Sequence, residues 1–406
     1  MALTANLLRG SGEDRAVTNV ELFFDLVYVF AVTQLSHHLL ARPTVTGALQ
    51  TALLLAMVWL VWVYTTWVTN WLDPQRTPVR LMLVGLMLGS LVLSAGLPRA
   101  FEDRGLWVGA AYAVMQVGRS IFAISGLRGD RLQRNFQRIL AWCVFSGALA
   151  VLGGFEHDGT RAGLWIATVA VDLLGGTVGF YTPGLGRSTT GDWTISGSHI
   201  AERCQAFVLI ALGESVVVIG TTLSDLHSVT GSEVGAFVAA FVGVVALWWV
   251  YFDRSAEAGA QKVAESADPG RLGRSAYHFI HPIMVAGIIV TAAADERVLA
   301  HPAATREAST AWFVLGGTAV FLAGHAAFKA TVWRTVPWRR LTAIVVLGLL
   351  GIVATSISAL TLGALTTIVV ILLAASDRLP SGVGGRTRQP RRFASTGSSA
   401  DEPERS

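Results

Sequence analysis

The stretch ALQTALLLAMVWLVWVYTTWVTN, residues 48–70, runs for 23 positions without one charged side chain. An α-helix rises about 1.5 Å per residue, and roughly 20 apolar residues are needed to cross the hydrocarbon of a bilayer. The stretch therefore predicts a membrane-spanning helix. The whole chain agrees, because 52% of its 406 residues are hydrophobic and 14% are charged. This composition is typical of membrane proteins and excludes a soluble globular protein.

Eleven other apolar runs have a similar length. The twelve expected spans are residues 20–40, 48–70, 79–97, 105–124, 136–154, 162–181, 200–223, 232–252, 276–294, 310–330, 341–358 and 359–375. The last two runs are almost continuous, and we divide them because together they are about two spans long. The sequence thus predicts an all-α polytopic bundle of about twelve transmembrane helices.

The basic residues indicate how the spans are oriented. Of the 31 Arg and Lys residues, 24 lie in or beside the segments on the side of both termini, 6 lie on the opposite side, and Arg119 lies within a span. Cytoplasmic loops carry an excess of Arg and Lys. We therefore expect a bacterial cytoplasmic membrane protein with both termini in the cytosol. Glu21 and Asp25 interrupt the first apolar run, so we expect no cleavable signal peptide.

The chain divides into five expected parts. They are a cytosolic segment (1–19), a first six-helix unit (20–182), a cytosolic linker (183–199), a second six-helix unit (200–376) and a disordered, basic cytosolic tail (377–406). The two units share sequence patterns: residues 60–64 (LVWVY) match 247–251 (LWWVY), and residues 113–122 (AVMQVGRSIF) match 319–328 (AVFLAGHAAF). We expect two parallel repeats, an arrangement that transporters and some channels use.

Charged residues within the spans are the main candidates for function, since each costs about 2.5–3.5 kcal/mol near the bilayer centre. In the first span Glu21 and Asp25 lie one helical turn apart on one face, and Gln34 lies further along. They are candidates for a cation-attracting vestibule. The structural alternative for Glu21 is that it stabilises a helix N-terminus.

The seventh span holds the strongest candidate. Glu202 and Arg203 mark its cytosolic end, and Glu214 lies 12 residues deeper with no basic residue near it in sequence. Glu214 is therefore expected to be protonated, to bind a cation or to pair across the bundle. The structural alternative is a neutral Glu that ties helices together by hydrogen bonds.

Arg119 and His325 occupy equivalent places in the two units, at the depth of the acidic residues. Repeat symmetry therefore predicts that Arg119 pairs with Asp25 and that His325 pairs with Glu202. Such pairs are either structural salt bridges or part of a transport path. Asp172, followed by glycines in the sixth span, is expected either to form a polar helix contact or to take part in function.

His278 and His281 lie three residues apart at the start of the ninth span. A proton relay fits them better than a metal site, because no third ligand accompanies them. The tryptophans of the second span are expected to anchor it at the lipid interface, with an aromatic ligand cage as the alternative; they are Trp59, Trp62, Trp67 and Trp71.

Several classes of site are not expected. Cys143 and Cys204 form no CxxC pair and have no zinc-type spacing, so we expect neither a disulfide framework nor a metal, and no cofactor. Neither His-Glu-x-x-His nor Gly-x-Ser-x-Gly occurs, and the basic residues report topology, so we expect neither an enzyme nor a nucleic-acid-binding protein.

Residues 20–35 (VELFFDLVYVFAVTQL) and 199–215 (HIAERCQAFVLIALGES) carry the most specific motifs. Together with residues 251–253 and 277–282, they resemble the bacterial low temperature requirement protein A family over nearly the whole chain except the tail. That family is named for a cold-growth phenotype, which implies no substrate, mechanism or cofactor. The resemblance implies motif positions at Glu21, Asp25, Glu202, Arg203 and Glu214.

We expect a transporter coupled to protons or another cation, with its site near the interface between the repeats. Its partners would be the lipid bilayer and an unidentified small solute. The alternatives are a cation channel, with its pore in one chain or in a homodimer, and a non-transporting membrane protein of envelope or cold-stress physiology.

Overall fold

The computed structural model describes residues 7–9, 16–189, 195–226 and 229–378. Within these ranges the chain is built from helices, and the β-type contacts are two isolated bridges, Leu8 with Leu72 and Thr182 with Gly186. This confirms the predicted all-α bundle. Residues 379–406, which make up nearly all of the predicted tail, lie outside the described ranges.

The described residues form twelve helices of 16 residues or more, and each overlaps one expected span. They are α1 (Asn19–Ala41), α2 (Val45–Trp71), α3 (Thr77–Gly96), α4 (Gly105–Gly126), α5 (Arg131–Phe155), α6 (Asp158–Thr177), α7 (Gly197–Asp225), α8 (Gly231–Phe252), α11 (His281–Ala300), α12 (Ala308–Trp333), α13 (Trp338–Val353) and α14 (Ala359–Ser376). The short elements are η1 (Leu97–Arg99), α9 (Ala256–Ala264), α10 (Pro269–Gly273) and the π-helical η3 (Arg274–Ile280).

In the described part of the chain, nine helical segments are long and apolar enough to cross a membrane. The helices α6, α11 and α13 are not among them; α13 has 16 residues, and α11 carries Asp295, Glu296 and Arg297 near its end. The chain is therefore a multi-pass membrane protein. The count of twelve crossings stays a prediction.

Local sequence explains where several helices begin. Thr44 caps α2 by accepting a hydrogen bond from the Gly47 amide at 3.1 Å, and Asp130 caps α5 through the Leu132 amide at 2.8 Å. Ser358 caps α14 through the Thr361 amide at 3.2 Å. Because α13 ends five residues earlier, at Val353, the last two apolar runs are separate helices, as predicted.

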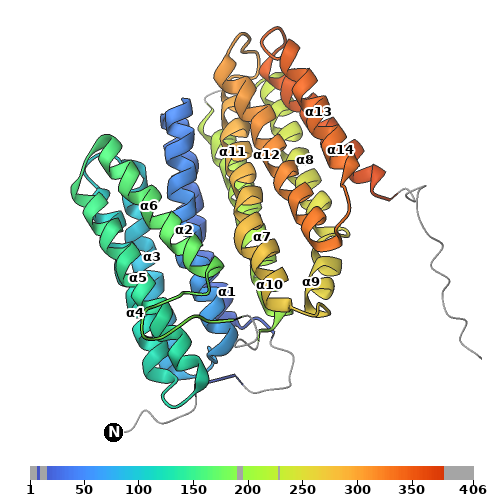
Figure 1. Cartoon of the computed structure of the whole chain (residues 1–406). Coiled ribbons are helices and arrows are strands. Elements are labelled where there is room, and N and C mark those ends of the chain that lie inside the picture. The colour runs from blue at the N-terminus through green and yellow to red at the C-terminus, as the bar shows by residue number, and fades with distance from the viewer. Residues whose placement is uncertain (1–6, 10–15, 190–194, 227–228, 379–406) are drawn as a thin grey trace, which may run out of the picture.

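The long helices form two bundles that stand side by side, one from α1–α6 and one from α7–α14 (Figure 1). In the first, α1 packs on α2 and α3, and contacts then run from α3 to α4, α5 and α6 and back to α2. In the second, α7 packs on α8 and α11, and contacts run from α11 to α12, α13 and α14 and back to α8. The order of contacts is thus the same in both bundles, with α9, α10 and η3 inserted between α8 and α11.

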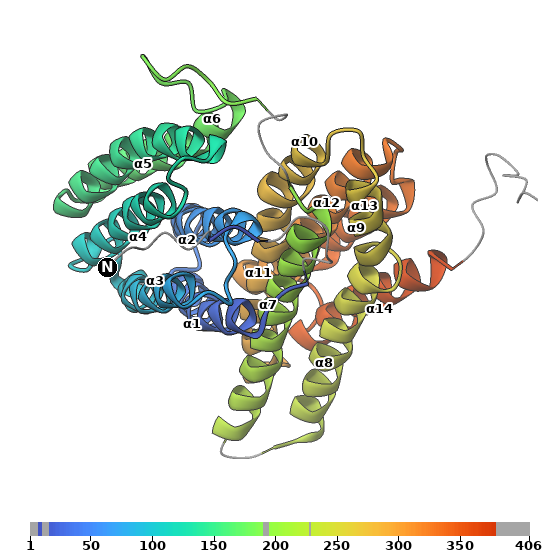
Figure 2. The ribbon, with the colours of Figure 1, turned by 90° about the horizontal axis from the view of Figure 1, so that it is seen from below.

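The two bundles meet through α1 and α2 on one side and α7 and α11 on the other. The view from below shows α1 next to α7, with α11 between α2 and α7 (Figure 2). In the predicted repeat α1 would correspond to α7, and each bundle contributes its first helix to the interface. Six of the candidate residues lie on α1 and α7 and therefore on helices that form this junction; they are Glu21, Asp25, Gln34, Glu202, Arg203 and Glu214.

Candidate functional site

The centre of the junction is a buried ion pair between Arg203 of α7 and Asp25 of α1. The Arg203 guanidinium donates from Nε to Asp25 Oδ2 at 2.8 Å and from Nη2 to Asp25 Oδ1 at 2.5 Å. Its Nη1 donates to Glu21 Oε1 at 3.1 Å. All three side chains are inaccessible to solvent. One guanidinium therefore binds two carboxylates that lie one turn apart on α1.

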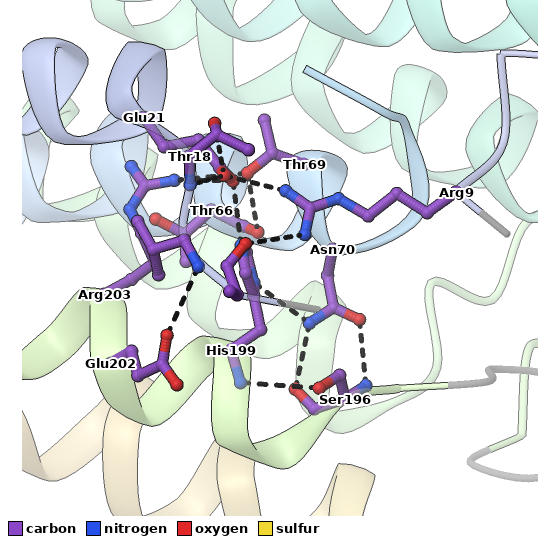
Figure 3. A network of polar contacts seen from close by, with 12 residues as sticks. Arg9, Thr18, Glu21, Thr66, Thr69, Asn70, Ser196, His199, Glu202 and Arg203 are labelled. Carbon is purple, nitrogen blue, oxygen red and sulfur yellow. Dashed lines mark hydrogen bonds and ion pairs between the residues drawn. The ribbon is translucent and has the colours of Figure 1, made fainter. Parts of the chain in front are cut away.

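Glu21 has three further partners, which are His199, Arg9 and Thr18 (Figure 3). His199 Nε2 lies 2.8 Å from Glu21 Oε1, and Arg9 Nη2 donates to Glu21 Oε2 at 2.7 Å. Asn70 Nδ2 lies 3.2 Å from His199 Nδ1. An amide NH₂ can only donate, so His199 accepts at Nδ1 and donates from Nε2 to the carboxylate. Glu21 also accepts from the Thr18 amide at 3.0 Å, in a capping box at the start of α1.

Helix α2 supports this network from the side. Trp62 Nε1 donates to Asp25 Oδ1 at 2.6 Å, and Thr69 Oγ1 accepts from Arg203 Nη1 at 3.2 Å. Asn70 exchanges two hydrogen bonds with the backbone of Ser196, at 2.9 and 3.0 Å, just before α7 begins. The network therefore joins α1, α2 and α7, and its carboxylates are balanced by Arg203 and Arg9. A buried pair with such partners is costly to break.

The predicted partners of Asp25 and Glu202 were wrong. Arg119 donates to Thr65 Oγ1 and to the Val61 carbonyl, both at 3.2 Å, and to Gln116. Glu202 accepts from the Val17 amide at 3.3 Å. Repeat symmetry alone had suggested those pairs, but the bundles place α7 against α1, which brings Arg203 to Asp25.

His325 lies buried in the second bundle, away from Glu202. Its Nδ1 accepts from Arg340 Nε at 3.5 Å, and its Nε2 has no hydrogen-bond partner among the described residues. Arg340 in turn binds Asp377 at the end of α14. The sequence did not point to Arg340, since it lies in a basic run that is typical of a cytosolic helix end.

Asp172 of α6 lies at the end of a second network of side-chain hydrogen bonds, inside the first bundle. Its Oδ2 accepts from Tyr112 and, at 2.9 Å, from Gln116 Nε2, while Gln116 Oε1 accepts from Arg119. Gln116 therefore bridges a carboxylate and a guanidinium that share no direct contact. Arg119 is only 1% exposed and no carboxylate lies within hydrogen-bond distance of it in the described residues.

A cavity of about 300 Å³ lies beside Arg119, between the first bundle and the η3 region of the second. Its lining combines aromatic rings with basic side chains; the main members are Tyr64, Trp67, Trp71, Phe136, Phe180, Arg119, Arg187, Arg274 and His278. No Asp or Glu occurs among the described residues that line it. A cavity of this kind favours an anion that also carries apolar or aromatic surface.

Hydrogen bonds across the junction hold the walls of this cavity. Trp67 Nε1 donates to His278 Nδ1 at 3.3 Å, and Trp59 Nε1 donates to the His278 carbonyl at 2.8 Å. Arg274 Nη1 donates to the Gly176 carbonyl at 2.5 Å. Arg274 was not among the candidate residues predicted from the sequence, and the tryptophans of α2 were predicted to lie at the lipid interface. That assignment was wrong for Trp59, Trp62 and Trp71, which are at most 5% exposed.

His278 and His281 do not act as a pair. His281 lies 3.0 Å from the Ala276 carbonyl through Nδ1 and 2.8 Å from the Tyr251 hydroxyl through Nε2. Because a carbonyl only accepts, Nδ1 carries the proton and Nε2 accepts from Tyr251. His281 is thus a satisfied core residue, whereas His278 lines the cavity.

Glu214 lies deeper in the junction than the ion-pair network, by about 18 Å of helical rise from Glu202. It is 2% exposed, and its Oε1 has no hydrogen-bond partner among the described residues. Two side chains of α1, Thr33 and His37, interact electrostatically with the Glu214 carboxyl group. His37 also interacts electrostatically with Glu296 of α11. Unlike Glu21 and Asp25, Glu214 has no guanidinium partner in the described ranges of the chain.

Gln34 is half-buried on α1 and makes no hydrogen bond within the described part of the chain. It therefore does not extend the network of Glu21 and Asp25 toward Glu214. Of the predicted residues, the structure brings Glu21, Asp25 and Arg203 into one network and places Arg119 and His278 at one cavity. Glu214 stands apart from both.

Comparison with known proteins agrees with the motifs in α1 and α7. The model of the bacterial low temperature requirement A protein family matches residues 16–375. An uncharacterised protein of Rhizobium meliloti (strain 1021) is 36% identical over 357 residues, which are 87% of each chain. No solved structure matches this chain. This multi-pass membrane protein therefore belongs to the bacterial low temperature requirement A family.

Proposed function

We propose that this protein is a secondary transporter that couples the movement of a small solute to protons or another cation. The observation that carries the proposal is Glu214, a buried carboxyl group at the junction of two helix bundles with one oxygen unpaired. Intramembrane carboxyl groups of this kind are typical of proton and cation pathways. Protonation of Glu214 would supply the coupling, with His37 of α1 as a titratable group of the other bundle that interacts with it electrostatically.

The matching order of contacts in the two bundles supports an internal duplication. In transporters built from repeats, substrate and coupling ions bind near the repeat interface, and one half moves against the other. Here the Asp25–Arg203 pair ties the bundles near the end where α1 begins, and Glu214 lies toward the other end of α7. We propose that the pair is the fixed contact and that motion occurs on the Glu214 side. We place the protein in the bacterial cytoplasmic membrane with both termini in the cytosol.

We propose that the transported solute is a small organic anion that binds in the cavity beside Arg119. The described lining offers the Arg119 and Arg274 guanidinium groups and the rings of Tyr64 and Trp67, and it offers no carboxylate. Arg119 lies 5.3 Å above the Tyr64 ring, so a ring and a positive charge face the same space. A proton bound at Glu214 would offset the charge of an anion during co-transport. The same lining argues against a cation channel, because it would repel the permeant ion.

Transport is tested in proteoliposomes that contain a pH-sensitive dye, to which small organic anions are added one at a time. We expect solute-dependent proton entry in the native protein and its loss in Glu214→Gln. The matched control is Glu233→Gln, because Glu233 is a half-exposed residue in the capping box at the start of α8 and glutamine retains that box. Conductive flux without proton movement would establish a channel, and silence toward every solute would favour a structural role.

The anion site is tested separately, by the binding of the transported anion to purified protein. We expect Arg119→Met to weaken binding at least about tenfold, which corresponds to about 1.4 kcal/mol, and Arg119→Lys to retain part of the affinity because its charge remains. Arg104→Met is the matched control, since Arg104 stacks on Trp107 away from the cavity. Unchanged affinity in Arg119→Met would remove Arg119 from the site.

A further inference from the structure

A second, smaller cavity lies inside the bundle α7–α14, apart from the cavity beside Arg119. Its volume is about 30 Å³, and its lining comes from α8, α11, α12 and α14. The polar residues in the lining are one carboxyl group and four hydroxyl groups, those of Asp295, Thr291, Thr318, Thr366 and Thr367. No basic side chain lines it in the described part of the chain. The space suffices for one or two particles the size of a water molecule.

Two oxygen atoms at this cavity have no partner. Asp295 Oδ2 and Thr366 Oγ1 are buried atoms that make no hydrogen bond to any described residue. Thr366 is only 5% exposed. The nearest basic residue in sequence, Arg297, is engaged elsewhere, because it donates to Thr310 at 3.0 Å and to Glu307 at 3.2 Å. Asp295 is half-buried, and no basic side chain among the described lining residues compensates its buried Oδ2, so the site favours a positive occupant, either a cation or a proton.

The other hydroxyl groups have already donated their protons to backbone carbonyls. Thr291 donates to Gly287 at 2.9 Å, Thr318 to Val314 at 3.2 Å and Thr367 to Ala239 at 3.3 Å. Each oxygen therefore has only lone pairs left to offer to the cavity. A cavity that presents acceptors from several helices and a single carboxylate suits a small, hard, monovalent cation with oxygen ligands.

We propose that this cavity is a Na⁺ site, in which the Asp295 carboxylate supplies the compensating charge and the threonine hydroxyls supply neutral oxygen ligands. Occupation would join α11, α12 and α14 through one ion, because the proposed oxygen ligands come from these three helices. The site is separate from the cavity beside Arg119, since the two share no lining residue. It therefore stands whether or not Glu214 couples transport.

The test is the thermal unfolding of the full chain in detergent, followed by tryptophan fluorescence in NaCl, KCl or choline chloride at equal ionic strength. Because a ligand that binds only the folded state stabilises it, we expect Na⁺ to raise the melting temperature by about 2–4 °C in a saturable manner. We expect K⁺ and choline to have a smaller effect. An equal response to all three salts, or no response, would overturn the proposal.

Substitutions in the cavity test whether the Na⁺-dependent rise in melting temperature arises there. Asp295→Asn and Thr366→Val should each abolish the Na⁺-dependent shift, and the second removes only one oxygen, so folding is expected to survive. The matched control is Thr222→Val, because the Thr222 hydroxyl bonds the Val218 carbonyl on α7, outside the cavity. Retention of the shift in both cavity variants refutes the site. A melting temperature that depends on pH through Asp295 but not on Na⁺ would show that a proton, rather than Na⁺, is the occupant.

Discussion

Replacement of Arg203 by methionine tests whether the junction between the bundles depends on one guanidinium. The substitution keeps an unbranched side chain but removes three hydrogen bonds to carboxylates and one to Thr69. Glu21 retains Arg9 and His199 as partners, whereas Asp25 retains only Trp62 among the described residues. The cost should therefore arise mainly at Asp25. Loss of one partner of a buried ion pair costs about 3–5 kcal/mol, and we expect this decrease in the free energy of unfolding.

The measurement is denaturant unfolding in detergent, followed by tryptophan fluorescence. The double variant Asp25→Leu, Arg203→Met removes both charges, so it should cost less than the sum of the single variants by about 0.5–3 kcal/mol. Arg42→Met is the matched control, because Arg42 pairs with Glu102 where the side chains are 29% and 50% exposed, and such pairs contribute about 0–1 kcal/mol. If Arg203→Met costs no more than this control, or if the single costs simply add, the reasoning fails.

Two further predictions concern packing and topology. A Cβ added at Gly287 of α11 would lie 2.3 Å from the Phe321 backbone nitrogen of α12, so Gly287→Ala should lower the free energy of unfolding by about 1–3 kcal/mol. Gly118→Ala serves as the control, because there is open space around Gly118. Equal stability of the two variants would contradict the packing argument. Both native cysteines are buried, so labelling should report on introduced cysteines. With both termini in the cytosol, Asp103→Cys should react with an impermeant maleimide in intact cells, and Arg128→Cys should react only after permeabilisation. The reverse pattern would contradict this orientation.

Most of the helices could be predicted from the lengths of apolar runs, because each span must satisfy its own backbone in lipid. Even the nearly continuous run at the end divides where Ser358 caps α14. The elements between α8 and α11 could not be predicted in the same way. Helix α9 has nine residues and leaves no run of spanning length, and the expected span 276–294 took most of the π-helical η3 for the start of a membrane-spanning α-helix.

The candidate site could be predicted only residue by residue. Charges inside apolar runs drew attention to Glu21, Asp25, Arg203 and Glu214, because lipid makes each of them expensive. Which charges pair depends on which helices are neighbours, and periodicity carries no such information. Hydropathy also cannot distinguish a side that faces lipid from one that faces protein, which is why buried Trp62 was assigned to the interface.

The Asp25–Arg203 pair joins residues 178 positions apart, and this separation has a consequence for how the protein is made. The first six helices enter the bilayer while Arg203 is still to be synthesised, so Asp25 has no guanidinium partner during that interval. The charge of Asp25 in the first half is therefore compensated by Arg203 only after α7 has been inserted. Two half-chains produced separately in one cell should stabilise each other, and the amino-terminal half produced alone should be a substrate for membrane quality control.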